Sequence, residues 1–179
     1  MTNAFRGCTS LESIPDYAPN VKSTKEMFED CTSLKTAPAL PSTVELMNFM
    51  FRNCTSLVTP PSAINATSFG YYTCAFMFNG CTSLTSVIIG NKVTYIGSLA
   101  FADCTSLTSA PSVLPATTLA NYCYYYMFSY CTSLTSAPNI LPATTLAESC
   151  DSSMFYGCKN LTTAPQLLAT ILAKNCYSS

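Results

Sequence analysis

The sequence predicts a repeat solenoid of the leucine-rich-repeat type. We expect a right-handed stack of about seven coils, each with short parallel β-strands and a short helix or turn. Three observations lead to this prediction. The pattern Phe-x-x-Cys-x-x-Leu occurs seven times, its copies follow one another at intervals of 23 or 27 residues, and the residues after each copy also repeat. A single unit of this length buries too little apolar surface to fold alone, so neighbouring units must stack and share a core.

The Phe, Cys and Leu of each copy are expected to point inward in every coil. Stacked coils are separated by about the spacing between β-strands, ~4.8 Å, so each inward position becomes a column of like residues. The two clearest columns are Phe5, Phe28, Phe51, Phe78, Phe101, Phe128 and Phe155, and Cys8, Cys31, Cys54, Cys81, Cys104, Cys131 and Cys158.

Each unit should begin with a short strand, as at residues 84–89, followed in most units by a proline that ends it because proline lacks an N–H. A second extended piece is expected at 93–96. Apolar residues recur at helical spacing in the segment 120–128, which predicts a helix of one to three turns there, longer in the 27-residue units. Gly97 suits the tighter turn that replaces this helix in a 23-residue unit.

We expect residues 1–179 to form one solenoid domain. The chain begins and ends inside the repeat and shows no polar cap, which suggests a fragment of a longer array truncated at both ends. No signal peptide is recognisable in the sequence, and the apolar runs are too short to insert into a membrane.

Charged residues make up only 9% of the chain, and eleven of the 17 lie in residues 1–54. Nucleic acid is therefore not an expected partner, because phosphate binding needs clustered Lys and Arg. The later units present a neutral surface rich in Tyr, Thr and Ser.

Catalytic chemistry is not predicted, and neither is a cofactor or a metal site. The chain has no His, which excludes Ser-His-Asp and Cys-His arrangements. The one adjacent acid pair, Glu29-Asp30, is better explained as a solvated turn than as the carboxylate pair of a glycosidase, because adjacent side chains tend to diverge. The eleven cysteines form two columns, which favours reduced, buried thiols over disulfides such as Cys74–Cys81 or Cys123–Cys131.

Tyrosines are the strongest functional lead. Tyr122, Tyr124, Tyr125, Tyr126 and Tyr130 cluster in one unit, and at least one of the three consecutive rings should face water. Exposed Tyr gives contact area at low entropic cost and is common in binding surfaces. The alternative is that the rings only coat Met127 and Phe128, and the sequence leaves both interpretations open.

The segment Val93-Thr94-Tyr95-Ile96-Gly97-Ser98-Leu99-Ala100-Phe101-Ala102-Asp103-Cys104-Thr105-Ser106-Leu107 resembles the BspA-like (Treponema-type) leucine-rich repeat. The resemblance covers essentially the whole chain. It implies a bacterial protein that is extracellular or on the cell surface, with a role in adhesion. The Pro- and Tyr-rich 27-residue units depart from the usual unit of that family.

The functional prediction is a non-catalytic binding or adhesion solenoid for a protein or glycan partner, contacted through the strand face or the Tyr-bearing face. One alternative is a structural spacer or self-assembling element of a surface or phage fibre, associating through its uncapped ends. The other is an accessory repeat domain of a larger enzyme.

Overall fold

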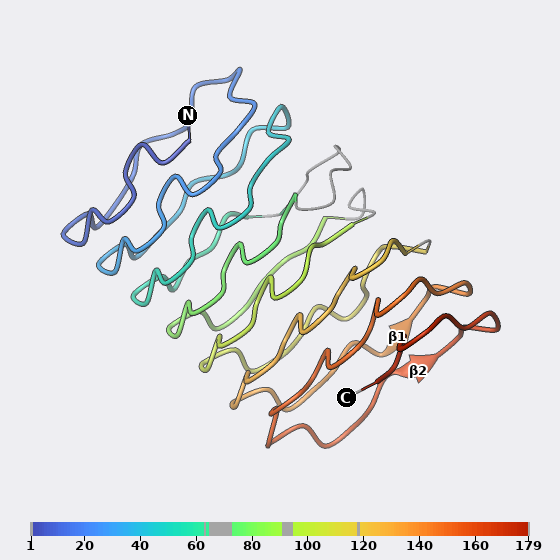
Figure 1. The fold of residues 1–179 in the computed structure, drawn as a ribbon. Coiled ribbons are helices and arrows are strands. Elements are labelled where there is room, and N and C mark those ends of the chain that lie inside the picture. The colour runs from blue at the N-terminus through green and yellow to red at the C-terminus, as the bar shows by residue number, and fades with distance from the viewer. Residues whose placement is uncertain (1, 63, 65–72, 91–94, 118, 179) are drawn as a thin grey trace.

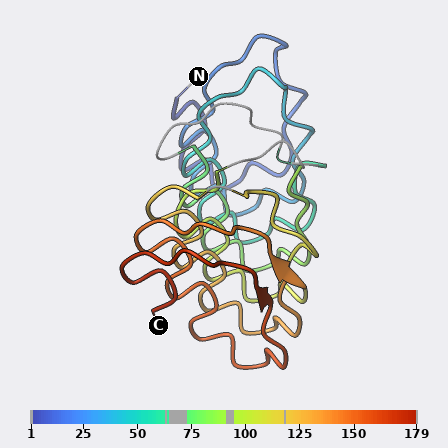
Figure 2. The ribbon, with the colours of Figure 1, turned by 90° about the vertical axis from the view of Figure 1, so that its right-hand side faces the viewer.

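The chain winds into an elongated stack of coils, and successive coils lie side by side from the N-terminus toward the C-terminus (Figure 1, Figure 2). This computed structural model describes residues 2–62, 64, 73–90, 95–117 and 119–178. The leucine-rich-repeat architecture that the sequence predicts is the one observed.

Regular strands are very short. β1 (Ile140–Leu141) pairs in parallel with β2 (Gln166–Leu167), with Ile140 opposite Gln166 and Leu141 opposite Leu167. Other neighbouring coils meet through single parallel bridges, such as Ile64 with Ile89. The strand expected at 84–89 is reduced to that bridge, and Val93 and Thr94 of the second expected piece lie outside the described residues.

The predicted helix at 120–128 is wrong, because this segment forms consecutive turns, and no helix is found anywhere in the part of the chain that the structure describes. An α-helix would send every N–H to the carbonyl four residues back. Here the odd-numbered N–H groups of Cys123, Tyr125 and Met127 donate to the carbonyls three residues back, at 3.1, 3.3 and 3.0 Å. The even-numbered N–H groups of Tyr122, Tyr126 and Phe128 donate instead to the following coil, at 3.0, 3.0 and 2.9 Å. Hydrogen bonds between coils therefore replace half of those that a helix would make.

The burial pattern explains why the sequence looked helical. Cys123 and Tyr124 point inward, Tyr125 and Tyr126 lie nearer the surface, and Met127 and Phe128 point inward again. This repeat of about four residues is close to the helical 3.6. The backbone differs, because alternate residues such as Tyr122, Tyr124 and Tyr126 take positive φ angles of 60, 65 and 51°.

The residue before each repeated Cys also has positive φ, between 57 and 74°. These residues are Gly7, Asp30, Asn53, Gly80, Asp103, Tyr130 and Gly157. Gly, Asn and Asp reach this left-handed region most easily, so six of the seven fit the backbone they occupy. Tyr130 is the exception, and its ring lies against Gly157 in the next coil, where an added Cβ would come within 2.7 Å of a ring carbon.

Stacked phenylalanines form the centre of the core. Neighbouring ring centroids along the column are 5.4–5.8 Å apart and the rings are nearly parallel, with interplanar angles of 4–15°. The rings from Phe28 to Phe128 are fully buried, whereas Phe5 at the end of the column is 41% exposed.

The cysteine column is joined to the phenylalanine column by hydrogen bonds. The Sγ of Cys54 donates to the Phe28 carbonyl at 3.1 Å, and the backbone N–H of Cys31 donates to the same oxygen at 3.1 Å. Each such carbonyl therefore uses both of its acceptor positions. Sγ–carbonyl contacts of 3.0–3.2 Å recur from Cys31 to Cys158, and all eleven cysteines are free thiols, so neither alternative disulfide is present.

Gly97 is needed for a different reason from the one expected. Its φ lies outside the positive region, but a Cβ at this position would lie 2.6 Å from the Ala75 nitrogen and 2.7 Å from the Ala75 Cα. The glycine therefore permits the backbones of two coils to approach closely.

Candidate binding surface

Five tyrosines from two adjacent coils form one exposed aromatic cluster, which we call the tyrosine patch. Its members are Tyr122, Tyr125, Tyr126, Tyr130 and Tyr156. The two coils are aligned here by backbone hydrogen bonds, including one of 2.7 Å from the Tyr130 N–H to the Tyr156 carbonyl. Tyr122, Tyr130 and Tyr156 are 39, 46 and 48% exposed, and Tyr125 and Tyr126 are partly buried.

The rings of the patch pack edge to face. Ring centroids are 4.6 Å apart between Tyr125 and Tyr126, 5.6 Å between Tyr122 and Tyr125, and 5.3 Å between Tyr130 and Tyr156. Tyr126 and Tyr156 join the two coils at 6.1 Å. Aromatic rings prefer this arrangement over face-to-face stacking.

Tyr124 lies in the core and not in the patch. Its side chain is 2% exposed, and its hydroxyl accepts a hydrogen bond of 3.3 Å from the Ala116 N–H. Burial raises the pKa of this hydroxyl well above its ordinary value. Of the five tyrosines that the sequence singled out, four are therefore exposed or partly exposed.

Tyr156 is the member that sequence reasoning did not include among the site residues. It stands one residue after Phe155, so it comes from a different repeat from the other four tyrosines. Alignment of the coils on their phenylalanines could have found it, because it falls next to the unit that holds the other tyrosines. Tyr95 is buried, and Tyr71 and Tyr72 lie outside the described residues.

Two acidic residues belong to the coils around the tyrosine patch. Asp103 is exposed and precedes Tyr130 in the same column, and the pKa of Tyr130 is raised by its hydrogen bond to Tyr156 and, to a smaller extent, by Asp103. On the other side, the Glu148 carbonyl accepts the Tyr122 N–H at 3.0 Å, and the Glu148 carboxylate lies 3.9 Å from the Lys174 ammonium, which offsets its charge.

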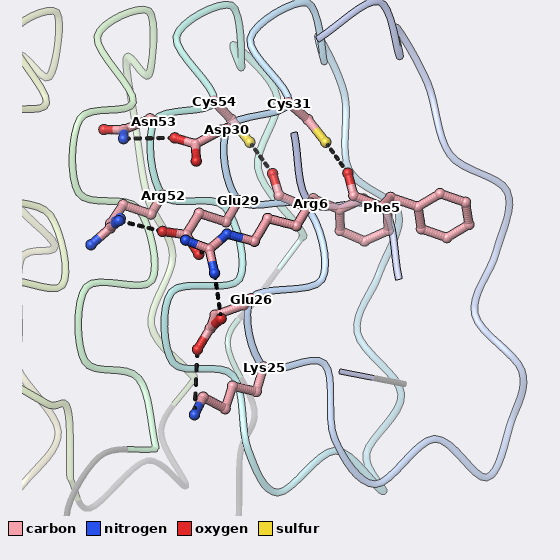
Figure 3. Close-up of polar contacts among 11 residues, drawn as sticks. Phe5, Arg6, Lys25, Glu26, Glu29, Asp30, Cys31, Arg52, Asn53 and Cys54 are labelled. Carbon is pink, nitrogen blue, oxygen red and sulfur yellow. Dashed lines mark hydrogen bonds and ion pairs between the residues drawn. The ribbon is translucent and has the colours of Figure 1, made fainter. Parts of the chain in front are cut away.

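The N-terminal coils carry charged residues at the corresponding turns (Figure 3). Arg6 pairs with Glu26 and with Glu29 at 3.1 Å each, and Arg52 pairs with Glu29 from the opposite side. Glu29 is almost fully buried between the two guanidinium groups. These ion pairs join successive coils at the N-terminal end of the stack. The tyrosine patch lies on later coils, where charged residues are few.

The strand side offers a second exposed surface. Ile88, Val113, Ile140 and Leu167 are all exposed on coils that follow one another. A shallow groove of about 360 Å³ runs between Ile88 and Val113, lined also by Pro111 and Pro115. This surface is aliphatic and carries few polar groups that could orient a partner.

The remaining groups do not assemble into a reactive site in the described residues. No three His, Cys, Asp or Glu side chains gather there to hold a metal ion, and no helix is long and apolar enough to cross a membrane. Burial raises the pKa of the Cys31 thiol to about 11 and that of the Cys74 thiol to about 12, so these two thiols are protonated and poorly reactive at neutral pH.

A cavity of about 530 Å³ lies at the last coil and is lined mainly by apolar side chains together with Asp151, Tyr156 and Tyr177. Burial raises the pKa of Asp151 from 3.8 to about 7. The Cys150 thiol donates to this carboxylate at 3.6 Å. An isolated buried acid of this kind does not provide the paired groups that hydrolysis needs.

Comparison with known proteins gives one family. The family described as BspA type leucine rich repeat region matches residues 1–77 and 72–178, in six copies. No curated protein matches the chain.

Three solved structures are similar to the chain. The leucine rich repeat protein of T. pallidum is 28% identical, with a TM-score of 0.62 over 90% of this chain and 70% of that one. A leucine-rich repeat protein from Bacteroides ovatus is 22% identical, with a TM-score of 0.37 over 89% of this chain and 56% of that one. A leucine rich cell surface protein from Faecalibacterium prausnitzii is 17% identical, with a TM-score of 0.36 over 94% of this chain and 62% of that one.

Proposed function

This chain belongs to the BspA-type leucine-rich repeat family, and on that basis we propose that it is a non-catalytic binding solenoid that contacts its partner through the tyrosine patch. We place it on the bacterial surface or outside the cell, in an adhesive role, which is where such repeats commonly act. The proposal includes the seven right-handed coils expected from the seven copies of the repeat.

The exposure and the arrangement of the patch together support this function. Tyr122, Tyr130 and Tyr156 are 39, 46 and 48% exposed, so a large part of each side chain is at the surface. Tyr122 contacts Tyr125, and Tyr130 contacts Tyr156, in edge-to-face pairs with interplanar angles of 86 and 89°. Each ring therefore has an aromatic neighbour that favours its orientation. Preorganised tyrosines of this kind lose little entropy on binding.

The aliphatic strand surface is the weaker candidate. Specific interfaces combine an apolar centre with polar groups that fix orientation. The tyrosine patch has both in the same side chains, whereas Ile88, Val113 and Ile140 offer only apolar contact.

The test is binding of the purified chain to arrays of bacterial and host surface proteins and of oligosaccharides, with and without the triple change Tyr125→Ser, Tyr126→Ser and Tyr130→Ser. Tyr124 must be left unchanged because it is part of the core. We expect at least a tenfold loss of affinity for the triple variant and none for Val113→Thr, a matched exposed change on the strand side. Equal binding by the triple variant and the wild type would refute the proposal.

A structural role is the second candidate, because the uninterrupted stack of rings and thiol hydrogen bonds suits a rod that sets distance. Sedimentation of the chain alone distinguishes the two. Concentration-dependent oligomers without any ligand, together with no array binding, would favour the spacer or fibre element.

A further inference from the structure

One position of the repeat holds a tyrosine in one coil and an acid in the next. Tyr124 and Asp151 are equivalent, because each directly follows a cysteine of the second column and lies four residues before a column phenylalanine. Tyr177 follows the next cysteine of that column and holds the same position in the last coil. Along the stack, the short side chain of Asp151 therefore stands between two tyrosines.

In the first of these coils the tyrosine fills the interior. Tyr124 is 2% exposed, and its hydroxyl accepts a hydrogen bond of 3.3 Å from the Ala116 N–H. An aspartate ends where the ring of a tyrosine begins, so Asp151 does not fill the same space in its own coil. Ala143, the counterpart of Ala116, is also buried, and its unit has no tyrosine at the position of Tyr124.

The cavity of about 530 Å³ lies beside Asp151. Leu141, Phe155, Pro165 and Leu167 contribute to its mainly apolar wall. The smaller side chain in place of a tyrosine accounts for part of this space. Pockets of this volume with apolar walls are typical of sites that bind small molecules.

Two polar atoms at the cavity have no partner in the protein. Asp151 is 6% exposed, and one of its carboxylate oxygens accepts the Cys150 thiol at 3.6 Å. The other oxygen, Oδ1, is buried and has no hydrogen-bond partner among the described residues, and the same is true of the Tyr177 hydroxyl. Buried polar atoms without partners are costly and uncommon in folded proteins. Their position at one cavity indicates a ligand that supplies the missing hydrogen bonds.

We infer that this cavity binds a small aromatic amine, with its ring among the apolar side chains of the wall and its ammonium group donating to the Asp151 carboxylate. The Tyr124 ring shows that the interior of an equivalent coil accommodates an aromatic group. Among the described residues that line the cavity none is a Lys or an Arg, so the cation that would offset the charge of Asp151 comes with the ligand.

The site differs from the tyrosine patch in place and in the kind of ligand. Tyr156 is the one patch residue that also lines the cavity. A saccharide suits the cavity poorly, because most of the wall offers no hydrogen bonds to its hydroxyl groups. The inference therefore goes beyond the proposed function and does not depend on it.

The experiment is a titration of the isotope-labelled chain with tyramine, followed by amide chemical shifts. Tyramine is a probe of the ligand class, and 4-ethylphenol is the control because it has the same ring and hydroxyl without the amine. The pH is 8, above the pKa of about 7 that burial gives to Asp151. We expect shifts in residues 151–156 and 164–167, and at least about tenfold tighter binding of tyramine than of 4-ethylphenol, since hydrogen bonds between charged groups are among the stronger ones.

Variants locate the site. Asp151→Asn keeps the shape and removes the charge, so it should weaken tyramine at least about tenfold and leave 4-ethylphenol unchanged. Asp151→Tyr should abolish binding of both compounds, because a ring would then fill this coil as Tyr124 fills the preceding one. Asp103→Asn removes an exposed acid outside the cavity and should change neither. Thermal melting shows which variants are folded, and Asp151→Asn decides the matter if Asp151→Tyr is not.

Each of three results would overturn the inference: equal affinity for tyramine and 4-ethylphenol, equal binding of tyramine by the wild type and Asp151→Asn, or no shift in the cavity residues at millimolar tyramine. Array binding that is lost in the triple tyrosine variant, without any binding of tyramine, would reject the cavity site and support the proposed function. Tyramine binding together with array binding that ignores the triple variant would do the reverse.

Discussion

Replacing Phe101 by Ala tests whether the stacked rings stabilise the array one interface at a time. Phe101 is fully buried, and its ring stacks on Phe78 at 5.4 Å and on Phe128 at 5.6 Å. A buried Phe→Ala change costs about 3–5 kcal/mol, including the cavity it leaves. Phe5 is the matched control, because it has one stacked neighbour and is 41% exposed. Phe5→Ala should cost only about 1–2 kcal/mol, since less apolar surface and one ring contact are lost.

Urea unfolding monitored by circular dichroism measures the total free energy of unfolding, and hydrogen exchange locates the loss. In a stack of repeats each coil contacts only its neighbours, so the effect should be concentrated at the two interfaces of the mutated coil. The N–H groups of Phe78 and Phe101, bonded to Ala100 and Met127 at 2.8 and 3.0 Å, should exchange faster in Phe101→Ala. Equal costs for the two variants, or an exchange change spread evenly over all coils, would refute the reasoning.

Three further predictions follow from buried groups. Burial raises the pKa of Asp151 to about 7, so the folded state holds the carboxyl proton more tightly than the unfolded chain, and the free energy of unfolding should fall by up to about 4 kcal/mol as the pH rises from about 4 to about 7. Urea melts over this pH range measure the change, and Asp151→Asn should lose the dependence. Parallel pH curves for the two proteins would contradict the prediction. In a thiol assay without reductant the exposed Cys8 should react first in the folded chain, and all eleven thiols should react after unfolding; fewer than eleven would show that disulfides had formed. Gly97→Ala should destabilise the chain by roughly 1–3 kcal/mol, because its Cβ would collide with the Ala75 backbone. The control is Gly7→Asn, which should change the urea midpoint of unfolding little, because Gly7 has open space around it and Asn tolerates its φ of 73°. An unchanged stability of Gly97→Ala would show that the two coils can separate at no cost.

The inward columns were predictable from the sequence because they depend on spacing alone. Phe, Cys and Leu recur together in every unit, and stacking places equal positions above one another. The left-handed residue before each Cys was also visible in the sequence as a run of Gly, Asp and Asn, such as Gly7, Asp30 and Asn53. A left-handed residue there ends the preceding segment, and it is equally compatible with a helix that stops before it, because helices commonly end at such a residue.

The helix was mispredicted for a physical reason. Spacing shows which residues point inward, but it does not show where the backbone N–H groups find acceptors. In this stack the next coil lies within hydrogen-bonding distance, so Tyr126 and Phe128 donate across to it at 3.0 and 2.9 Å instead of back along their own coil. That competition exists only after the coils have assembled.

The sequence by itself determined the repeat, the composition of the core columns and the division into a charged N-terminal part and a tyrosine-rich later part. Only the tertiary structure decided which tyrosines face outward. Tyr124 and Tyr126 are two residues apart with similar positive φ, yet one is buried and the other joins the patch. The choice depends on contacts outside the local segment: the Ala116 N–H, eight residues earlier in the same unit, for the Tyr124 hydroxyl, and the Tyr156 ring of the next coil for Tyr126. These contacts form only when the coil closes and its neighbour stacks on it, so the spacing of the tyrosines does not specify them.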